Sequence, residues 1–225
     1  MLQNREPNTD QLIAINTLLN QKKFSETVCS ANSLLKAFPN SVNLISILTN
    51  VHINLNDYDA AIEVYSRLLN SEPKNSHIYK NLGALYSKKG DLNTAIKTYI
   101  RALDLNPSDA EGYYRLGNAL YDKGDLNASV ENYQKAIEIN NNYFDALYNL
   151  GNTLSKMKAF ERSIENFKSA LNIQPDHTGA LNNMGIAFFE TGKFKEAATT
   201  FKQAAKINPH PVTFEYIGRA TDVIR

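Results

Sequence analysis

A 34-residue period constrains this chain more than any other feature of its sequence. The turn-forming residues that keep the period are Pro39, Pro73, Pro107, Asn141, Pro175 and Pro209. Four glycines keep the same step, and these are Gly83, Gly117, Gly151 and Gly185. A period of this size is typical of stacked supersecondary units rather than of one closed core. The sequence therefore predicts an elongated repeat fold.

Residues 76–109 show what each unit contains. From His77 to Lys89 apolar residues recur at helical spacing, and Gly90 follows where a helix end favours glycine. A second apolar face runs from Asp91 to Leu105, and Pro107 stops it because proline lacks an amide hydrogen. Two helices joined by a glycine turn cannot bury their apolar faces alone, so each unit must stack on its neighbours.

This unit resembles the tetratricopeptide repeat in its residues and their spacing. The matching residues are Tyr79, Leu82, Gly83, Tyr86, Ala95, Tyr99 and Pro107, with tyrosine where the family pattern has tryptophan. The resemblance covers nearly the whole chain and implies an all-α, right-handed solenoid. We expect a single domain over residues 1–225, with repeats at 8–41, 42–75, 76–109, 110–143, 144–177 and 178–210 and a terminal helix at 211–225.

Composition narrows the classes of partner. Lys plus Arg is 24 and Asp plus Glu is 23, which leaves a net charge of +1 and no basic stripe for nucleic acid. The start MLQNREPNTD lacks the pattern of a secretory signal, and no segment approaches the roughly 20 apolar residues of a membrane helix. We therefore expect a cytoplasmic protein that binds neither nucleic acid nor membrane. The single cysteine, Cys29, is expected to be a small buried residue.

Each first helix has a second face that stacking does not need. At roughly 100° per residue, repeat positions 2, 5, 6, 9, 12 and 13 point away from the stacking residues. Positions 6 and 9 give 12 slots over six repeats, and seven of them hold asparagine although the chain has only 28 in 225 residues. They are Asn16, Asn50, Asn81, Asn118, Asn149, Asn152 and Asn183.

Two interpretations of this excess remain open. An asparagine amide offers a donor and an acceptor, which match the two polar groups of an extended peptide bond. The array is similar to the asparagine ladder of O-linked N-acetylglucosamine transferases, which implies peptide binding on the concave side of the solenoid. The alternative is that asparagine is common in this family on a solvated face.

The predicted peptide groove combines these amides with aromatic and basic residues of the same face. Its members are Asn50, Lys80, Asn81, Tyr114, Arg115, Asn118, Tyr148, Asn149, Asn152 and Asn183. The aromatic rings would supply apolar pocket walls, or would pack between repeats instead. Chaperone-binding members of the family hold a terminal carboxylate with lysines, but Ser46 and Glu111 stand where those lysines belong, so that specificity is not expected.

Nothing in the sequence points to catalysis. We find no phosphate-binding loop, no nucleophile elbow and no metal-ligand cluster, so no cofactor and no enzyme activity are expected. The sequence thus predicts a protein- or peptide-binding scaffold. One alternative is a substrate-recruiting or assembly module of a larger transferase-type enzyme whose catalytic domain is not in this chain. Another is self-association through the C-terminal helix.

Overall fold

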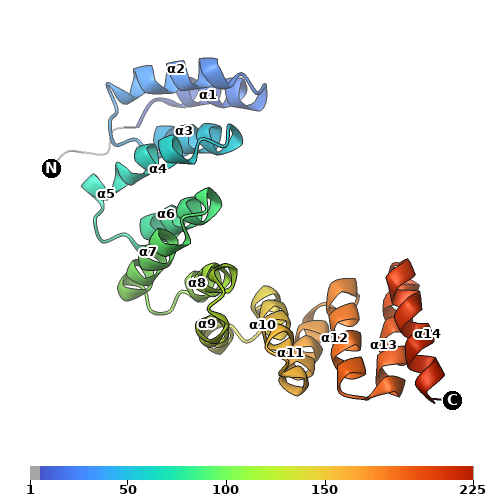
Figure 1. The fold of residues 1–225 in the computed structure, drawn as a ribbon. Helices are drawn as coiled ribbons and strands as arrows, with labels where there is room; N and C mark the ends of the chain where they lie inside the picture. Colours follow the sequence, from blue (N-terminus) through green and yellow to red (C-terminus); the bar gives the residue numbers. More distant parts are fainter. Residues whose placement is uncertain (1–5, 225) are drawn as a thin grey trace. The chain divides into compact units, whose positions relative to one another are not determined.

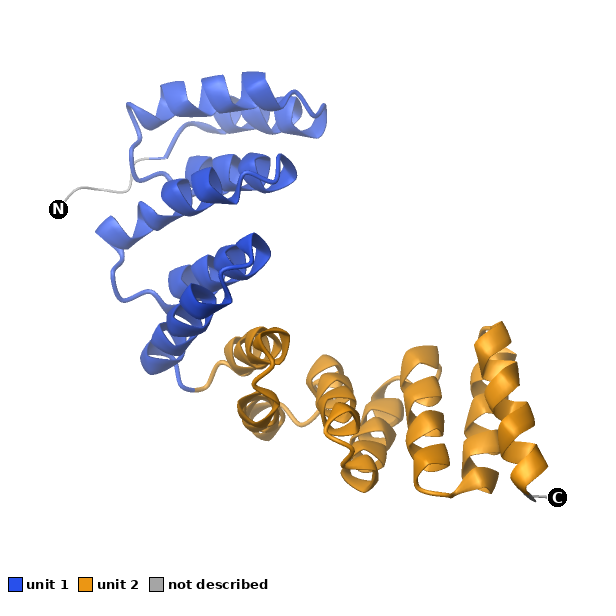
Figure 2. Cartoon of the chain, in the orientation of Figure 1, with its two compact units in different colours: residues 1–107 blue, residues 108–225 orange. Residues whose placement is uncertain are grey.

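The structure is a computed structural model that describes residues 6–224, and the ribbon over these residues contains helices and no strands (Figure 1). Residues 1–5, part of the stretch in which we expected no secretory signal, lie outside the described residues, as does Arg225. The chain divides into two compact units, residues 1–107 and 108–225 (Figure 2). The expectation of a single domain stays a prediction.

Unit 1, as far as the structure describes it, contains seven helices in chain order. They are α1 (Thr9–Asn20), α2 (Phe24–Leu35), α3 (Val42–Asn54), α4 (Tyr58–Ser66), α5 (Leu68–Ser71), α6 (Ser76–Lys89) and α7 (Leu92–Leu105). The second helix of residues 42–75 divides into α4 and the short α5 at Arg67, whose backbone keeps helical dihedral angles (φ −58°, ψ −28°). The remaining helices form consecutive hairpins.

Unit 2 contains three regular hairpins and a final helix over its described residues. The helices are α8 (Ala110–Lys123), α9 (Leu126–Ile139), α10 (Phe144–Lys156), α11 (Phe160–Ile173), α12 (Thr178–Glu190), α13 (Phe194–Ile207) and α14 (Pro211–Ile224). The two helices of each hairpin pack together, and α11 packs on α12 and α13 on α14. This is the expected α-solenoid of helix-turn-helix repeats, and α14 occupies the predicted terminal helix.

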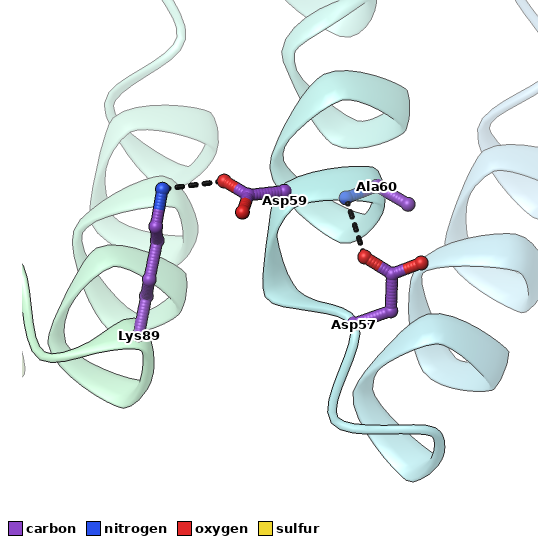
Figure 3. Close-up of polar contacts among 4 residues, drawn as sticks. All are labelled: Asp57, Asp59, Ala60 and Lys89. Atoms are coloured by element: carbon purple, nitrogen blue, oxygen red, sulfur yellow. Dashed lines mark hydrogen bonds and ion pairs between the residues drawn. The ribbon is translucent and has the colours of Figure 1, made fainter.

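Aspartates define where several helices begin. The side chains of Asp57, Asp91, Asp109 and Asp125 each accept a hydrogen bond from the backbone N–H three residues later, at 3.0–3.2 Å. These bonds satisfy amide groups that have no partner inside the helix. Figure 3 shows the Asp57 cap beside an ion pair between Asp59 of α4 and Lys89 of α6, which joins consecutive repeats of unit 1. The pKa of Lys89 is raised by the Asp59 hydrogen bond and charge.

The first helix ends in a left-handed residue in every repeat. Among residues 6–224, the six residues with positive φ follow the 34-residue step: Lys22 (57°), Asn56 (56°), Gly90 (87°), Gly124 (91°), Lys158 (60°) and Gly192 (73°). Glycine adopts this conformation without strain, whereas a residue with a Cβ atom does so at a cost. The same left-handed turn therefore recurs in all six repeats, including the three in which the residue is not glycine.

Alanines at one position of four successive second helices are buried. Ala102, Ala136, Ala170 and Ala204 are at most 2% exposed. Cys29 corrects a prediction, because it is exposed on α2 while Thr27 and Ala31 are buried. Two residues along a helix turn the side chain by about 200°, so Cys29 faces away from both of them. In the described part of the chain, no helix combines the length and hydrophobicity needed to span a membrane.

Candidate functional site

Paired asparagine amides form the centre of the candidate site in unit 2. Asn149 of α10 donates through Nδ2 to Oδ1 of Asn118 on α8 at 3.0 Å. Asn183 of α12 donates in the same way to Oδ1 of Asn152 on α10 at 2.7 Å. In both pairs the residues are 31 apart, so position 9 of one repeat meets position 6 of the next. Four of the seven asparagines of the predicted array thus form contacts between neighbouring first helices of unit 2.

Tyrosine hydroxyls extend both amide pairs. Nδ2 of Asn149 lies 3.4 Å from Oη of Tyr114, and Nδ2 of Asn183 lies 3.4 Å from Oη of Tyr148. The Tyr114 ring packs 5.1 Å from that of Tyr143, and the Tyr148 ring packs 5.0 Å from that of His177. Tyr114 and Tyr148 are half-buried by these contacts. Each tyrosine therefore packs against the last residue of its own repeat and at the same time bonds an amide of the next repeat.

Each amide pair keeps one donor and one acceptor group outside the pairing. In the described part of the chain, Nδ2 of Asn118 and of Asn152 and Oδ1 of Asn149 and of Asn183 make no intramolecular hydrogen bond. The four side chains are half-buried, so these groups remain accessible. The result is an alternating set of donors and acceptors along one face, held in fixed orientations. We call this surface of α8, α10, α12 and α14 the first-helix face.

A cavity of about 320 Å³ opens on this face between α8 and α10. Its lining residues are Asn118, Tyr121, Asp122, Tyr133, Asn149, Asn152 and Thr153. Nζ of Lys156 lies 4.4 Å from the centroid of the Tyr121 ring, a cation–π contact beside the cavity. We call this space the polar cavity.

Tyr133 joins the polar cavity to the helix behind it. Its side chain comes from α9, is 1% exposed, and donates through Oη to Oδ1 of Asn118 at 2.6 Å. Burial raises the pKa of the Tyr133 phenol well above its ordinary value. The hydroxyl therefore stays protonated at neutral pH and holds the Asn118 oxygen, so that the Asn118 amide nitrogen remains available.

Three of the predicted groove residues belong to unit 1, and the structure gives them surroundings different from those of the amide pairs. Asn50 on α3 is exposed, and Asn81 on α6 donates through Nδ2 to Oη of Tyr65 at 2.7 Å. Lys80 is buried, with 7% of its surface exposed. Arg115, which belongs to unit 2, pairs with Glu111 in the preceding turn of α8, with Nη2 and Oε1 2.6 Å apart. The six remaining predicted residues, all in unit 2, form the amide and tyrosine array.

Sequence reasoning did not identify Tyr133 and Thr153 as part of the site. Tyr133 stands on a second helix, at the repeat position that carries Phe167 and Phe201 in the next two repeats. The hydroxyl that Tyr133 has and phenylalanine lacks was a signal in the sequence, because a buried phenol needs a hydrogen-bond partner. Among residues 6–224, no group of three or more His, Cys, Asp or Glu side chains is placed to hold a metal ion.

Family models match most of the chain. A model described as TPR repeat matches residues 50–90, 85–124 and 117–158, and one described as tetratricopeptide repeat matches residues 142–209. No curated protein matches the sequence.

Solved structures resemble the chain over most of its length. MamA is 30% identical, with a TM-score of 0.67 over 71% of this chain and 94% of that chain. The C-terminal part of a TPR repeat-containing protein from Cytophaga hutchinsonii has a TM-score of 0.78 at 18% identity, over 95% of this chain and 89% of that one. YrrB, a TPR protein with an unusual peptide-binding site, has a TM-score of 0.68 at 18% identity, over 84% and 97%.

Proposed function

Since the chain belongs to the tetratricopeptide repeat family, we propose that it is a non-catalytic scaffold that binds an extended segment of a partner protein. The binding surface is the first-helix face of unit 2, including the polar cavity. The ligand lies across α8, α10 and α12, and its main chain exchanges hydrogen bonds with the asparagine amides.

One observation carries this proposal: every paired amide retains one hydrogen-bonding group that makes no bond within the described chain. Nδ2 of Asn118 and of Asn152 can donate to peptide carbonyl groups, and Oδ1 of Asn149 can accept from a peptide N–H. Because the partner amide and the tyrosine hydroxyls fix each side chain, little rotamer entropy is lost on binding. A merely solvated face would gain nothing from such fixed orientations.

Peptide recognition through the main chain suits the chemistry of the site. Amides that alternate as donors and acceptors match an extended backbone and place no demand on its side chains. Tyr121 adds aromatic surface at the polar cavity, where a ligand side chain can be enclosed. The peptide-binding site of YrrB, which shares the fold, offers a precedent.

The test replaces the amides of the polar cavity together. The triple variant Asn118→Ala, Asn149→Ala, Asn152→Ala removes both members of the Asn118–Asn149 pair. Two remaining donors lose an acceptor: Oη of Tyr133 loses Oδ1 of Asn118, and Nδ2 of Asn183 loses Oδ1 of Asn152 but retains Tyr148. We expect a folded chain that is less stable by about 1–2 kcal/mol. Proteins captured from a cell lysate by the wild-type chain should be lost selectively, as measured by mass spectrometry.

A matched control removes three asparagines from the second helices of the same unit. Asn127, Asn132 and Asn166 lie on α9 and α11, away from the amide pairs, and their change to Ala should leave capture unchanged. Circular dichroism establishes that both variants are folded. Equal capture by the wild-type chain and by the folded amide variant would show that the asparagines serve stacking alone.

A further inference from the structure

A second cavity opens on the first-helix face of unit 2, between α12 and α14. It has a volume of about 170 Å³, about half that of the polar cavity. Ile186 of α12, Phe201 of α13, and Val212 and Tyr216 of α14 supply most of its wall. A hydrogen bond of 3.3 Å from Thr213 Oγ1 to Asn182 Oδ1 ties α14 to α12 at this place. We call this space the apolar cavity.

The two cavities are built on the same repeat position. Tyr133 lines the polar cavity and Phe201 lines the apolar one, and both are the buried aromatic residue of a second helix, two repeats apart. The hydroxyl of Tyr133 bonds Asn118, whereas Phe201 has no hydroxyl and its ring stacks on Tyr216 with a centroid distance of 5.1 Å. One architecture therefore yields a hydrogen-bonding cavity and an aliphatic one.

The polar cavity has the charge that a basic side chain requires. Asp122 is the one charged residue of its lining, and in the described part of the chain its carboxylate forms no ion pair or hydrogen bond. Lys156, the nearby cation, lies over the Tyr121 ring and forms no ion pair with Asp122. Oδ1 of Asn149 adds a neutral acceptor. Together these acceptors favour a guanidinium or ammonium group.

The apolar cavity has the opposite character. Ile186 and Val212 offer aliphatic surface, and the aromatic pair of Phe201 and Tyr216 closes the space. Burying an aliphatic side chain there removes apolar surface from water on both partners, which favours binding. A charged side chain would lose its hydration without gaining an ion pair.

The spacing between the cavities sets the spacing between the two ligand side chains. Neighbouring packed helices lie roughly 8–10 Å apart, and the cavities are separated by two such steps, from α8/α10 to α12/α14. The separation is thus about 20 Å. An extended chain advances about 3.3 Å per residue, so about six residues span this distance.

We propose that unit 2 selects an extended peptide with a basic side chain in the polar cavity and an aliphatic side chain, about six residues away, in the apolar cavity. This specificity rests on the proposed function, because the peptide main chain must follow the amides that lie between the two cavities. Charge complementarity with Asp122 identifies the basic end.

The experiment selects random displayed peptides, about twelve residues long so that they exceed the span, on the immobilised full chain. The expected pool is enriched in pairs of a basic and an aliphatic residue five to seven positions apart, an interval of about 20 Å. Asp122→Lys should remove the basic preference and weaken a selected peptide about tenfold. Val212→Asp should remove only the aliphatic preference, and an acidic residue at the start of α14 is compatible with that helix.

Glu138→Lys is the matched control for charge reversal, since Glu138 is exposed on the second helix α9. It should leave both preferences and the affinity unchanged. Peptides that bind without the spaced pair, or that respond equally to Asp122→Lys and Glu138→Lys, overturn this inference while the proposed function stands. A chain that selects no peptide overturns both.

Discussion

The ring of Tyr133 lies directly on the backbone of Gly117, so that a Cβ atom added to Gly117 would meet Cδ1 of that ring at 2.7 Å. The same contact recurs between Gly151 and Phe167, where the added Cβ atom would meet Cε1 of the ring at 2.6 Å. In four consecutive hairpins, including all three of unit 2, the first and second helices thus approach through glycine against an aromatic ring. Glycine is required at these positions because the ring leaves no room for a Cβ atom. Its backbone freedom is not the reason, since both glycines lie inside a helix.

We predict that Gly117→Ala destabilises unit 2 by about 1–3 kcal/mol, because the rigid Tyr133 ring must shift in a close-packed hairpin. Gly218→Ala in α14 is the matched control, since a Cβ atom there meets nothing within 4 Å. It should stabilise the chain by about 0.5–1 kcal/mol through better helix propensity. Urea unfolding followed by circular dichroism measures both. Equal effects at the two positions would contradict the packing argument.

The orientation of the amides predicts that a change from asparagine to aspartate has different effects on stability at the two positions of a pair. Asn152→Asp keeps the oxygen that accepts from Asn183 and should be nearly neutral for stability. Asn183→Asp replaces the donor with a carboxylate oxygen facing Oδ1 of Asn152, and should cost about 1–2 kcal/mol at neutral pH. Acidification should reduce this cost, because the protonated carboxyl can donate. Thermal unfolding at neutral and acidic pH tests the pair, and equal losses would contradict the assigned orientation.

The left-handed turn at Lys158 predicts a stabilising substitution. Because φ is 60° at Lys158 and 91° at Gly124 in the equivalent turn, Lys158→Gly should stabilise the chain by about 1 kcal/mol. The reciprocal change, Gly124→Lys, should destabilise it by a similar amount. The free energies of unfolding of the two variants measure the effect. If both changes shift stability in the same direction, the turn conformation is not its cause.

The cap at Asp91 predicts a dependence of stability on pH. Hydrogen bonds from the Thr94 side chain and backbone lower the pKa of Asp91 below its ordinary value of 3.8. The stabilisation is therefore fully present above pH 3.8 and is lost as the pH falls through the lowered folded-state pKa. Asn caps a helix without titrating, so Asp91→Asn should lose less stability on acidification than the wild-type chain. Thermal unfolding at several pH values measures this difference. If the melting temperatures of the two chains fall equally as the pH is lowered, Asp91 does not cause the pH dependence.

The ends of helices could be predicted from sequence because their cause is local. The expected helix from Asp91 to Leu105 agrees with α7, since an aspartate cap and the residues before Pro107 fix its two ends. The left-handed turns at Lys22 and Lys158 escaped prediction because lysine gives no local signal for positive φ. There the packing of the two flanking helices imposes the turn.

The amide pairs could be predicted in part. Helical periodicity placed Asn118, Asn149, Asn152 and Asn183 on one face, and in unit 2 these side chains form two hydrogen-bonded pairs. It could not show that position 9 of one repeat meets position 6 of the next, because that contact depends on how two first helices stack. The alternation of accessible donors and acceptors follows from this stacking and not from any single helix.

The amide contact also determines how this chain can change its length. Since both bonds of unit 2 join position 9 of one repeat to position 6 of the next, Asn118 and Asn183 carry the same groups as the ends of a removable segment. Excising residues 144–177 would bring these two side chains together in the orientation already used twice. Duplicating the same residues would add one more pair. The paired amides are thus compatible with gain or loss of whole repeats, so that the surface proposed to bind a peptide can be lengthened or shortened by recombination without a change in its chemistry.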